Sequence, residues 1–164
     1  MTCESHASYA IDAWPMRILA LDSTLRGYSG GYIDDERLAW LDAELRAHPR
    51  RPTIVAMHHP PFRTGNAGLD RYAFRNVEAL AEVVRSHRHI TRLVAGHLHT
   101  VLMRPWCGTI ACTAPSTSPQ FVLGRSMLGI GVEAAGMLLH EWSFNAEVYT
   151  YIVRIESGLE QQIA

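Results

Sequence analysis

The first half of the chain alternates short apolar runs with two helical patterns, and this alternation limits the possible folds more than any other feature. The apolar runs are Arg17–Asp22, Thr53–Met57 and Arg92–Ala95. The spacing of apolar residues predicts one helix from Asp35 to about Ala47 and another from Val77 to about His87. Such a series favours a parallel sheet with right-handed crossovers, which is an α/β fold.

Polar, glycine and proline residues mark the ends of these elements. Asp34 is suited to cap the first helix, and His48–Pro49 ends it because proline cannot continue the hydrogen-bond ladder. Leu25–Gly31 and Phe62–Phe74 are rich in loop-forming residues and are predicted to be loops. Pro60 and Pro61 are expected to stop the second strand directly after two histidines.

The second half of the chain lacks helical patterns and contains short strand-like runs. They are Thr109–Thr113, Gln120–Leu123, Met137–Trp142 and Glu147–Ile155. The last run alternates, which predicts that Tyr149, Tyr151, Val153 and Ile155 share one face. We expect antiparallel strands here, as part of a second sheet, and a single domain over residues 1–164.

Composition places the chain among ordinary globular proteins. Hydrophobic residues make up 48% and charged residues 19%, which argues against disorder. The net charge is −1 and no basic stretch stands out, so the sequence gives no electrostatic support for binding nucleic acid or an anionic membrane. Three cysteines without metal-type spacing favour reduced thiols, and the first residues lack a signal-peptide pattern, so we expect a soluble cytoplasmic protein.

Two histidine motifs follow directly on two of the predicted strands. His58 and His59 come after Thr53–Met57, and Gly96-His97-Leu98-His99 comes after Arg92–Ala95. The carboxyl ends of parallel strands lie at one edge of a sheet, so the two motifs are expected to converge. Gly96 would permit a tight turn, and His97 and His99 would point to the same side if their backbone were extended. Imidazoles in this pattern predict a transition-metal site.

The remaining histidines are interpreted as structural. They lie at helix ends, near the amino terminus or within an apolar strand, where a hydrogen-bond partner or the helix dipole is sufficient. These residues are His6, His48, His87, His89 and His140.

The two histidine motifs together resemble those of a known family. His58-His59-Pro60-Pro61 followed by Gly96-His97-Leu98-His99 resembles the C-terminal part of the calcineurin-like metallophosphoesterases, closest to the class III cyclic-nucleotide phosphodiesterase and glycerophosphodiesterase branch. The resemblance extends from about Tyr9 to about Ile155. Its other segments are Leu21-Asp22-Ser23, Leu38-Ala39-Trp40-Leu41, Phe62-Arg63-Thr64-Gly65 and Thr113-Ala114-Pro115-Ser116-Thr117.

The resemblance implies a fold and an activity. The fold is a four-layer α/β/β/α sandwich, and the chain would be its C-terminal half. The activity is hydrolysis of cyclic nucleotides such as cAMP, or of small phosphodiesters, at a centre of two iron, manganese or zinc ions. His58 and His97 would bind one metal and His99 the other. Arg63, Thr64 and Asn66 would face the substrate, and His59 would either face the substrate or orient its neighbour.

The carboxylate side of such a centre is absent from the sequence. Family members carry Asp-x-His, Gly-Asp and Gly-Asn-His motifs before the region that matches, and none of these precedes Arg17. Without a bridging carboxylate, three neutral imidazoles would hold at most one metal, and weakly. The missing half would also leave apolar faces exposed, such as that of Arg17–Asp22, which favours association.

Three interpretations of the chain follow. It is a fragment of a functional hydrolase, a non-catalytic metal-binding or interaction module, or one half of a split enzyme whose N-terminal half is encoded separately. The module is expected to be stable by itself, and a homo-oligomer is one form that it could take.

Overall fold

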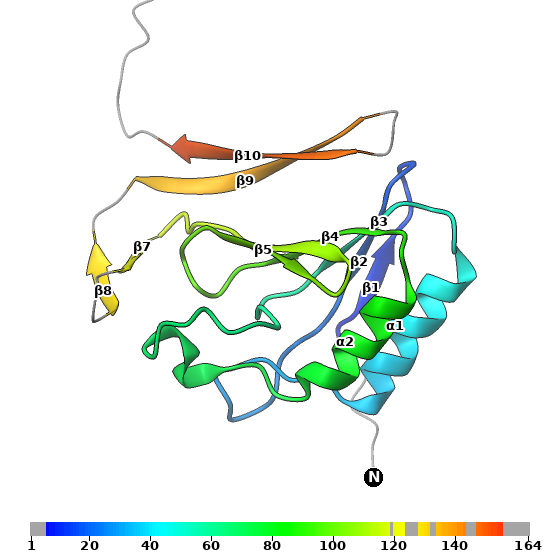
Figure 1. Ribbon diagram of the computed structural model, residues 1–164, viewed down its shortest axis with the longest axis horizontal. Coiled ribbons are helices and arrows are strands. Elements are labelled where there is room, and N and C mark those ends of the chain that lie inside the picture. The colour runs from blue at the N-terminus through cyan, green and yellow to red at the C-terminus, as the bar shows by residue number, and fades with distance from the viewer. Residues whose placement is uncertain (1–5, 119, 124–127, 132–133, 144–146, 156–164) are drawn as a thin grey trace, which may run out of the picture.

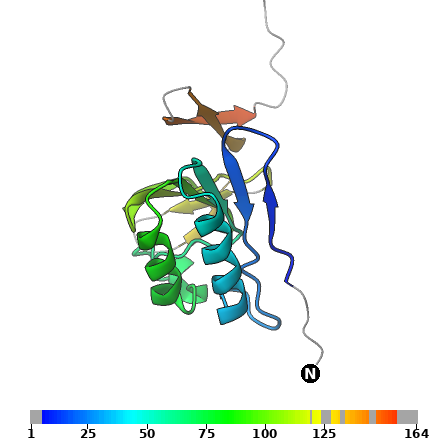
Figure 2. The same cartoon turned by 90° about the vertical axis from the view of Figure 1, so that its right-hand side faces the viewer.

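Side chains at alternate strand positions give the central sheet two apolar faces. One cross-strand row consists of completely buried residues: Leu19, Val55, Leu93 and Ala111. In the computed structural model this row packs against apolar side chains of α1 (Asp35–Ala47) and α2 (Val77–Ser86). The two helices lie side by side on the same face of the sheet, which Figure 2 shows from the side.

The sheet has six strands in the order β1-β2-β3-β4-β6-β5. They are β1 (Tyr9–Ile11), β2 (Arg17–Ala20), β3 (Thr53–Ala56), β4 (Ile90–Ala95), β5 (Leu102–Trp106) and β6 (Thr109–Thr113). Strands β2, β3, β4 and β6 run parallel, and β1 and β5 pair antiparallel at the two edges. The structure describes residues 6–118, 120–123, 128–131, 134–143 and 147–155.

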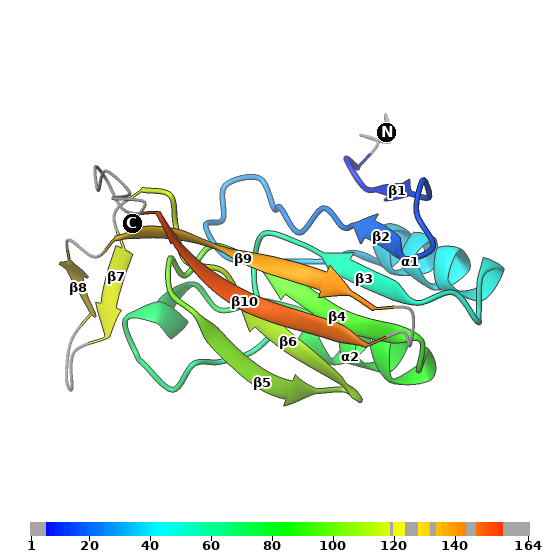
Figure 3. The same ribbon diagram turned by 90° about the horizontal axis from the view of Figure 1, so that it is seen from above.

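A hairpin covers the other face of the sheet (Figures 1 and 3). It consists of β9 (Ala135–Trp142) and β10 (Val148–Ile155), which pair antiparallel. Val148 and Trp142 of the hairpin pack against Ile54 of β3 and the half-buried Ile18 and Val94. A second small pair, β7 (Gln120–Leu123) and β8 (Leu128–Gly131), is also antiparallel. The layers are therefore helices, sheet and hairpin.

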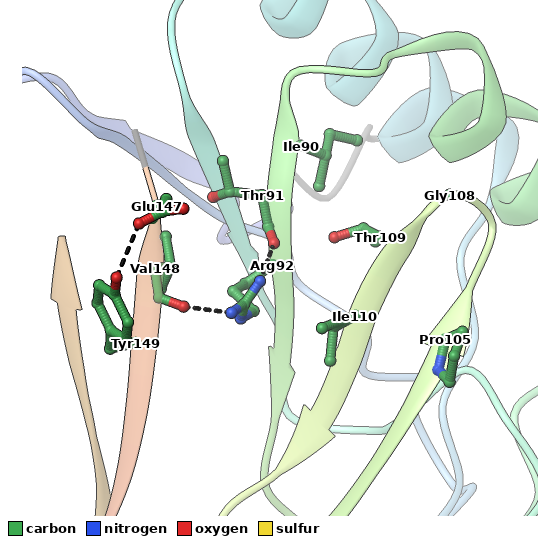
Figure 4. Close-up of a pocket in the computed structure, with 10 residues that line it drawn as sticks. All are labelled: Ile90, Thr91, Arg92, Pro105, Gly108, Thr109, Ile110, Glu147, Val148 and Tyr149. Carbon is green, nitrogen blue, oxygen red and sulfur yellow. Dashed lines mark hydrogen bonds between the residues drawn. The ribbon is translucent and has the colours of Figure 1, made fainter. Parts of the chain in front are cut away.

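The Arg92 side chain fastens the hairpin to the sheet (Figure 4). Its guanidinium donates one hydrogen bond to the carbonyl oxygen of Val148 in β10 and another to the carbonyl oxygen of Thr91. Nearby, the Tyr149 hydroxyl donates to the Glu147 carboxylate at 2.7 Å. A charged donor to a backbone carbonyl makes a stronger hydrogen bond than a neutral donor would, and here it joins β4 directly to the start of β10.

The main elements of the first half agree with the sequence predictions. Helix α1 has the predicted bounds, and the Asp34 carboxylate accepts the backbone N–H of Arg37 at 2.9 Å, as expected of an N-cap. Helix α2 ends at Ser86, one residue before the predicted end. The parallel arrangement of β2, β3 and β4 is confirmed.

Other predictions were incomplete or wrong. Strands β1, β5 and β8 were missed, and the predicted loop Phe62–Phe74 contains a short 3₁₀ helix, Leu69–Tyr72. Thr109–Thr113 is not purely antiparallel, because it pairs parallel with β4 as well as antiparallel with β5. The β9–β10 and β7–β8 pairs, by contrast, are antiparallel as predicted.

Apolar exposure differs from the prediction made for Arg17–Asp22. Leu19 and Leu21 are buried beneath the helices, and Ile18 is covered by the hairpin, so that strand does not present a bare face. Five exposed apolar side chains share the outer face of the hairpin, where each is 44–53% exposed: Met137, Leu139, Tyr149, Tyr151 and Ile155. Other exposed apolar side chains are Tyr9, Trp14, Tyr72, Met103, Ile110 and Ile152. The register places Tyr149, Tyr151, Val153 and Ile155 on one face, as predicted.

Neither α1 nor α2, nor any other helix among the described residues, combines the length and apolar character needed to cross a membrane.

The buried row predicts that Leu93→Ala destabilises the chain strongly. Leu93 is fully buried between the sheet and the helices, so removing its side chain leaves a cavity and lowers the free energy of unfolding by about 2–5 kcal/mol. Met103→Ala on the edge strand β5 is the matched control, because Met103 is exposed, and it should change the value by less than about 0.5 kcal/mol. Urea unfolding of both variants provides the measurement, and equal losses would contradict the packing described.

Candidate metal centre

Hydrogen bonds between β3 and β4 continue beyond the ends of the two strands. The N–H of Met57 donates to the Val94 carbonyl at 3.0 Å, and the N–H of Gly96 donates to the His58 carbonyl at 3.0 Å. The backbone of the first histidine motif is thus bonded directly to that of the second. The predicted convergence of the motifs is confirmed.

Three imidazoles form a cluster at this edge of the sheet. His58, His59 and His97 each offer one ring nitrogen, and these nitrogens lie within 4.8 Å of one another. The ring centroids of His59 and His97 are 4.6 Å apart, and those of His58 and His97 are 5.2 Å apart. His59 is buried, His97 is half-buried and His58 is exposed, so solvent reaches the cluster from one side.

The second motif is tightly turned rather than extended. His97 and His99 have positive φ angles of 64° and 49°, and the N–H of Leu98 donates to the Gly96 carbonyl at 2.7 Å. This hydrogen bond closes a γ-turn centred on His97, of the rare and strained type with positive φ. The expectation of an extended backbone at His97 and His99 was therefore wrong.

Gly96 does not have the role that the sequence suggested. Its φ is not in the left-handed region, and a Cβ added there would make an ordinary contact, 3.6 Å from His58 Nδ1. The unusual backbone conformation belongs to the two histidines themselves. Strain of this kind, of order 1–3 kcal/mol per residue, is typical of functional sites.

His59 is held by the loop that follows β2. Its Nδ1 lies 2.9 Å from the Ser23 hydroxyl, and its backbone N–H donates to the same oxygen at 3.2 Å. Gly31 of the same loop packs so closely that an added Cβ would lie 2.6 Å from His59 Cβ and 2.2 Å from the Phe74 ring. Only glycine fits at this position without displacing a neighbour.

Burial and mutual proximity keep the cluster neutral. Burial, and then the neighbouring His59 and His58, lower the pKa of His97 to about 4. Burial is also the main cause that lowers the pKa values of His58 and His59. At pH 7 the three imidazoles are therefore uncharged, which is the form that binds a metal.

The donor set fits one cation. Among the described residues the cluster contains no carboxylate, and two adjacent cations need negatively charged ligands between them. Asp22 acts electrostatically on His59, but its oxygens accept hydrogen bonds from Thr24 and Ala7 and face Arg37 at 3.5 Å. The residues that the structure describes thus suit a single-metal site and not, by themselves, a two-metal site.

The predicted substrate-side residues of the following loop are used partly for local structure. Thr64 donates its backbone N–H and its hydroxyl to Asp70, at 2.8 and 3.0 Å. The Asn66 side-chain oxygen accepts the N–H groups of Gly68 and Leu69. Arg63 is exposed and lines a surface hollow with Phe62 and Arg104. None of these contacts reaches the imidazoles.

Two histidines interpreted as structural have side-chain partners. His87 Nε2 lies 2.8 Å from an Asp42 carboxylate oxygen, and His140 Nδ1 lies 2.9 Å from the Thr150 hydroxyl across the hairpin. The Asp42 contact joins the end of α2 to α1.

A hollow of about 660 Å³ lies away from the imidazole cluster (Figure 4). It is lined by the first residues of β4, by β6 and by the start of β10, including Arg92, Thr109 and Glu147. Because the imidazoles follow the carboxyl end of β4, this hollow lies at the opposite end of the strand. It is therefore not part of the imidazole cluster.

Comparison with known proteins identifies the relatives of this chain. It is 38% identical over 112 residues to the glycerophosphodiester phosphodiesterase GpdQ of Enterobacter lignolyticus, covering 68% of this chain and 40% of that protein. It is 32% identical over 143 residues to a probable GpdQ of Arcobacter nitrofigilis, covering 85% and 52%. It is 35% identical over 105 residues to the cyclic AMP phosphodiesterase CpdA of Escherichia coli K12, covering 64% and 38%.

Solved structures agree on the fold. A dimetal phosphatase from Danio rerio superposes with a TM-score of 0.51 at 18% identity, over 66% of this chain and 48% of that one. A purple acid phosphatase from yellow lupin seeds superposes with a TM-score of 0.56 at 13% identity, over 90% and 32%.

These similarities support the resemblance to the calcineurin-like metallophosphoesterases that the histidine motifs indicate. No protein-family model matches the chain. The chain spans between about two fifths and half of the length of the relatives named above. Its α/β fold and its histidine motifs are those expected from the sequence for the C-terminal half of the family's sandwich.

The packing at Gly31 predicts a difference between two glycine substitutions. Gly31→Ala forces a Cβ against Phe74 and His59 and should lower the free energy of unfolding by about 1–3 kcal/mol. Gly96→Ala is the matched control, because its Cβ has room, and it should change the value by less than about 1 kcal/mol. Urea unfolding measures both, and a larger loss at Gly96 would show that the loop geometry is different.

The low pKa of His97 predicts that the metal-free chain loses stability in mild acid. An unfolded histidine titrates near pH 6.5, whereas the folded His97 titrates at about 4. Between these values the unfolded chain binds a proton that the folded chain does not, so the free energy of unfolding falls as the pH decreases. The His97 share of the loss reaches at most about 3 kcal/mol at pH 4.

Urea unfolding in EDTA at several pH values between 7 and 4 tests this dependence. His97→Gln should show a shallower decrease than the unmodified chain, since glutamine does not titrate. Identical slopes for the two proteins would contradict the burial of the His97 ring.

Proposed function

We propose that this chain supplies the histidine side of a metal-dependent phosphodiesterase. In its complete form the enzyme would hydrolyse cyclic nucleotides, such as cAMP, or small phosphodiesters of the glycerophosphodiester type. The observation that supports this most is the imidazole cluster at the joined ends of β3 and β4, in a chain related to GpdQ and CpdA.

In the complete centre we assign His58 and His97 to one metal and His99 to the other. Iron, manganese and zinc all suit imidazole combined with carboxylate, so the metal is one of these. A metal pair about 3.5–4 Å apart would polarise the phosphoryl oxygens and supply hydroxide near neutral pH. The chain's own contribution is to hold neutral imidazoles in place on a tightly turned backbone.

We assign the substrate side to His59, Arg63, Thr64 and Asn66. Arg63 is exposed beside the first histidine motif, where a guanidinium can bind phosphate oxygens in bidentate fashion. Thr64 and Asn66 would act mainly by fixing the loop that carries Arg63, since their side chains hold that loop through Asp70, Gly68 and Leu69. The Nδ1 hydrogen bond to Ser23 would orient His59.

The rest of the centre would come from an N-terminal half of the fold. The relatives are about twice as long as the part that this chain matches, and the outer face of the β9–β10 hairpin exposes a row of apolar side chains. That face would bury itself against the missing layer or, in a homo-oligomer, against a second copy. Completion by a separately encoded half is the split-enzyme form of the same proposal.

A second candidate function is a non-catalytic metal-binding or interaction module. It is favoured by one observation: among the described residues, the imidazole cluster has no carboxylate. In either case we propose a cytoplasmic location, in keeping with the free thiols of Cys107 and Cys112.

The coding sequence upstream of this chain separates the two candidates. The hydrolase proposal expects in-frame Asp-x-His and Gly-Asn-His motifs there or in a co-expressed partner. The corresponding longer protein or complex should hydrolyse bis(p-nitrophenyl) phosphate with Mn²⁺, and this chain alone should not.

In that complete protein, His97→Ala should lower the hydrolysis rate at least about a hundredfold, because it removes a metal ligand. His48→Ala, at the exposed end of α1, is the control and should leave the rate unchanged. Unchanged hydrolysis in His97→Ala would contradict the hydrolase proposal, and activity of this chain alone that depends on His97 would reject the non-catalytic module.

A further inference from the structure

The surface hollow beside Arg63, here called the arginine hollow, lies between two segments that follow the histidine motifs. Its volume is about 590 Å³, and Phe62–Thr64 line one side of it and Leu102–Pro105 the other. A hollow of this size suits a small ligand. Arg63 follows His59 by four residues, a stretch of chain that spans about 14 Å at most. The arginine hollow is therefore within reach of a substrate bound at the proposed metal centre.

The arginine hollow has two positive charges and no matching negative charge. Arg63 and Arg104 are both exposed and both line it, and no acidic residue of the described chain does so. Within the described ranges neither guanidinium is in an ion pair. Asp70 is the acidic residue nearest to Arg63 in the sequence, but its two oxygens accept hydrogen bonds from Thr64 and Gly65.

This charge distribution indicates the kind of ligand. Two guanidinium groups that share a hollow repel each other, and a bound anion offsets that repulsion. A guanidinium group binds phosphate oxygens through two parallel hydrogen bonds. A phosphomonoester matches two guanidinium groups because its charge at pH 7 is about −1.5 to −2. A phosphodiester carries a single negative charge and matches them less well.

Both arginines extend from a fixed backbone. Arg104 lies opposite Ala111 in the pairing of β5 with β6, and its guanidinium carbon is 5.8 Å from the centre of the Phe62 ring. This cation–π contact restrains the side chain, which therefore loses less conformational freedom when it binds a ligand. Arg63 belongs to the loop that hydrogen bonds to Asp70 hold in place. The two sides of the hollow are thus positioned before a ligand binds.

The hollow around Arg92 does not offer the same conditions. It also holds the Glu147 carboxylate, and Arg92 donates to the carbonyl oxygens of Thr91 and Val148. An anion there would compete with a contact that fastens the hairpin to the sheet. The arginine hollow has no such competitor, so we place the anion in it.

We propose that the arginine hollow binds a phosphomonoester group through Arg63 and Arg104. Two sources supply such a group: a second, terminal phosphate on a phosphodiester substrate, and the phosphomonoester that hydrolysis of a phosphodiester releases. The link to substrate or product rests on the proposed function, whereas binding of a phosphomonoester by this chain does not. The two claims can therefore fail separately.

Titration of the purified chain with phenyl phosphate, followed by ¹H–¹⁵N NMR, tests the binding. EDTA in the buffer keeps metal away from the imidazoles. Arg63→Gln and Arg104→Gln should each weaken binding at least about tenfold, because each removes charge-assisted hydrogen bonds. Arg88→Gln is the matched control, since Arg88 is also exposed but precedes β4, at the end of that strand away from the histidines. It should change the affinity by less than about twofold.

Two results would overturn the binding claim. One is an equal loss of affinity in Arg88→Gln and Arg104→Gln, which would show attraction to the surface as a whole. The other is no binding by the folded chain at tens of millimolar phenyl phosphate. Thermal unfolding verifies that each variant is folded, and Arg104→Lys replaces Arg104→Gln if that variant is not.

Kinetics of the complete enzyme distinguish the two sources of the phosphomonoester. The substrates are a thymidine dinucleotide, dTpdT, and the same dinucleotide with a terminal 5′-phosphate, pdTpdT. If the terminal phosphate of the substrate occupies the hollow, Arg104→Gln should raise KM at least about fivefold more for pdTpdT than for dTpdT. If the released product occupies it, the two KM values should change together, and Arg104→Gln should weaken inhibition by phenyl phosphate at least about fivefold.

The same kinetics can contradict the inference. If Arg104→Gln changes neither the ratio of the KM values nor the inhibition, the hollow has no role in the reaction. If neither dinucleotide nor bis(p-nitrophenyl) phosphate is hydrolysed, the proposed function fails, and the NMR titration still decides whether the arginine hollow binds a phosphomonoester.

Discussion

The pairing of β3 with β4 is the interaction on which the rest of the site depends. Parallel pairing sets Val55 beside Leu93 within the sheet, and the ladder then continues through Met57 to the hydrogen bond between Gly96 and His58. Two motifs far apart in the sequence are joined by backbone hydrogen bonds at the point where their imidazoles begin. Burial of the row beneath α1 and α2 gives that pairing its stability, because apolar area removed from water favours the folded state by roughly 25 cal/mol per Å².

The features of the site that do not favour folding of the metal-free chain are local, and they lie in the second histidine motif. His97 has a positive φ in a γ-turn, and its ring is crowded by two other imidazoles that lower its pKa. Neither feature helps a metal-free chain to fold. Both prepare the ring to bind a metal, since a fixed and neutral imidazole loses little freedom and no proton when it coordinates. Strain and desolvation at His97 thus support the proposal that this residue is a metal ligand.

Much of the fold could be predicted from the sequence, because the decisive signals were periodic or local. Leu38, Leu41 and Leu45 repeat at helical spacing, which together with Asp34 predicted α1 correctly. The parts that were missed depend on contacts distant in sequence. Strand β5 contains Pro105 and two other exposed residues, and it forms only because the edge of β6 is available for pairing. The γ-turn at His97 has no signal in residue types, so the cluster of His58, His59 and His97 could not be distinguished from a set containing His99.

The same limits apply to the β9–β10 hairpin. Alternation in Glu147–Ile155 predicted two faces for the last strand, and the register confirms them, but the sequence did not indicate which face packs on the sheet. The structure shows that Val148 and Trp142 face inward and that Tyr149, Tyr151 and Leu139 face outward.

The central claim is that the joined ends of β3 and β4 bring His58 and His97 to one metal ion. Anomalous diffraction from a zinc-soaked crystal of the chain tests it most directly. The account predicts a zinc peak about 2.0–2.1 Å from a ring nitrogen of each of these two histidines. A peak bound by only one of them, or zinc bound only elsewhere on the chain, would contradict it.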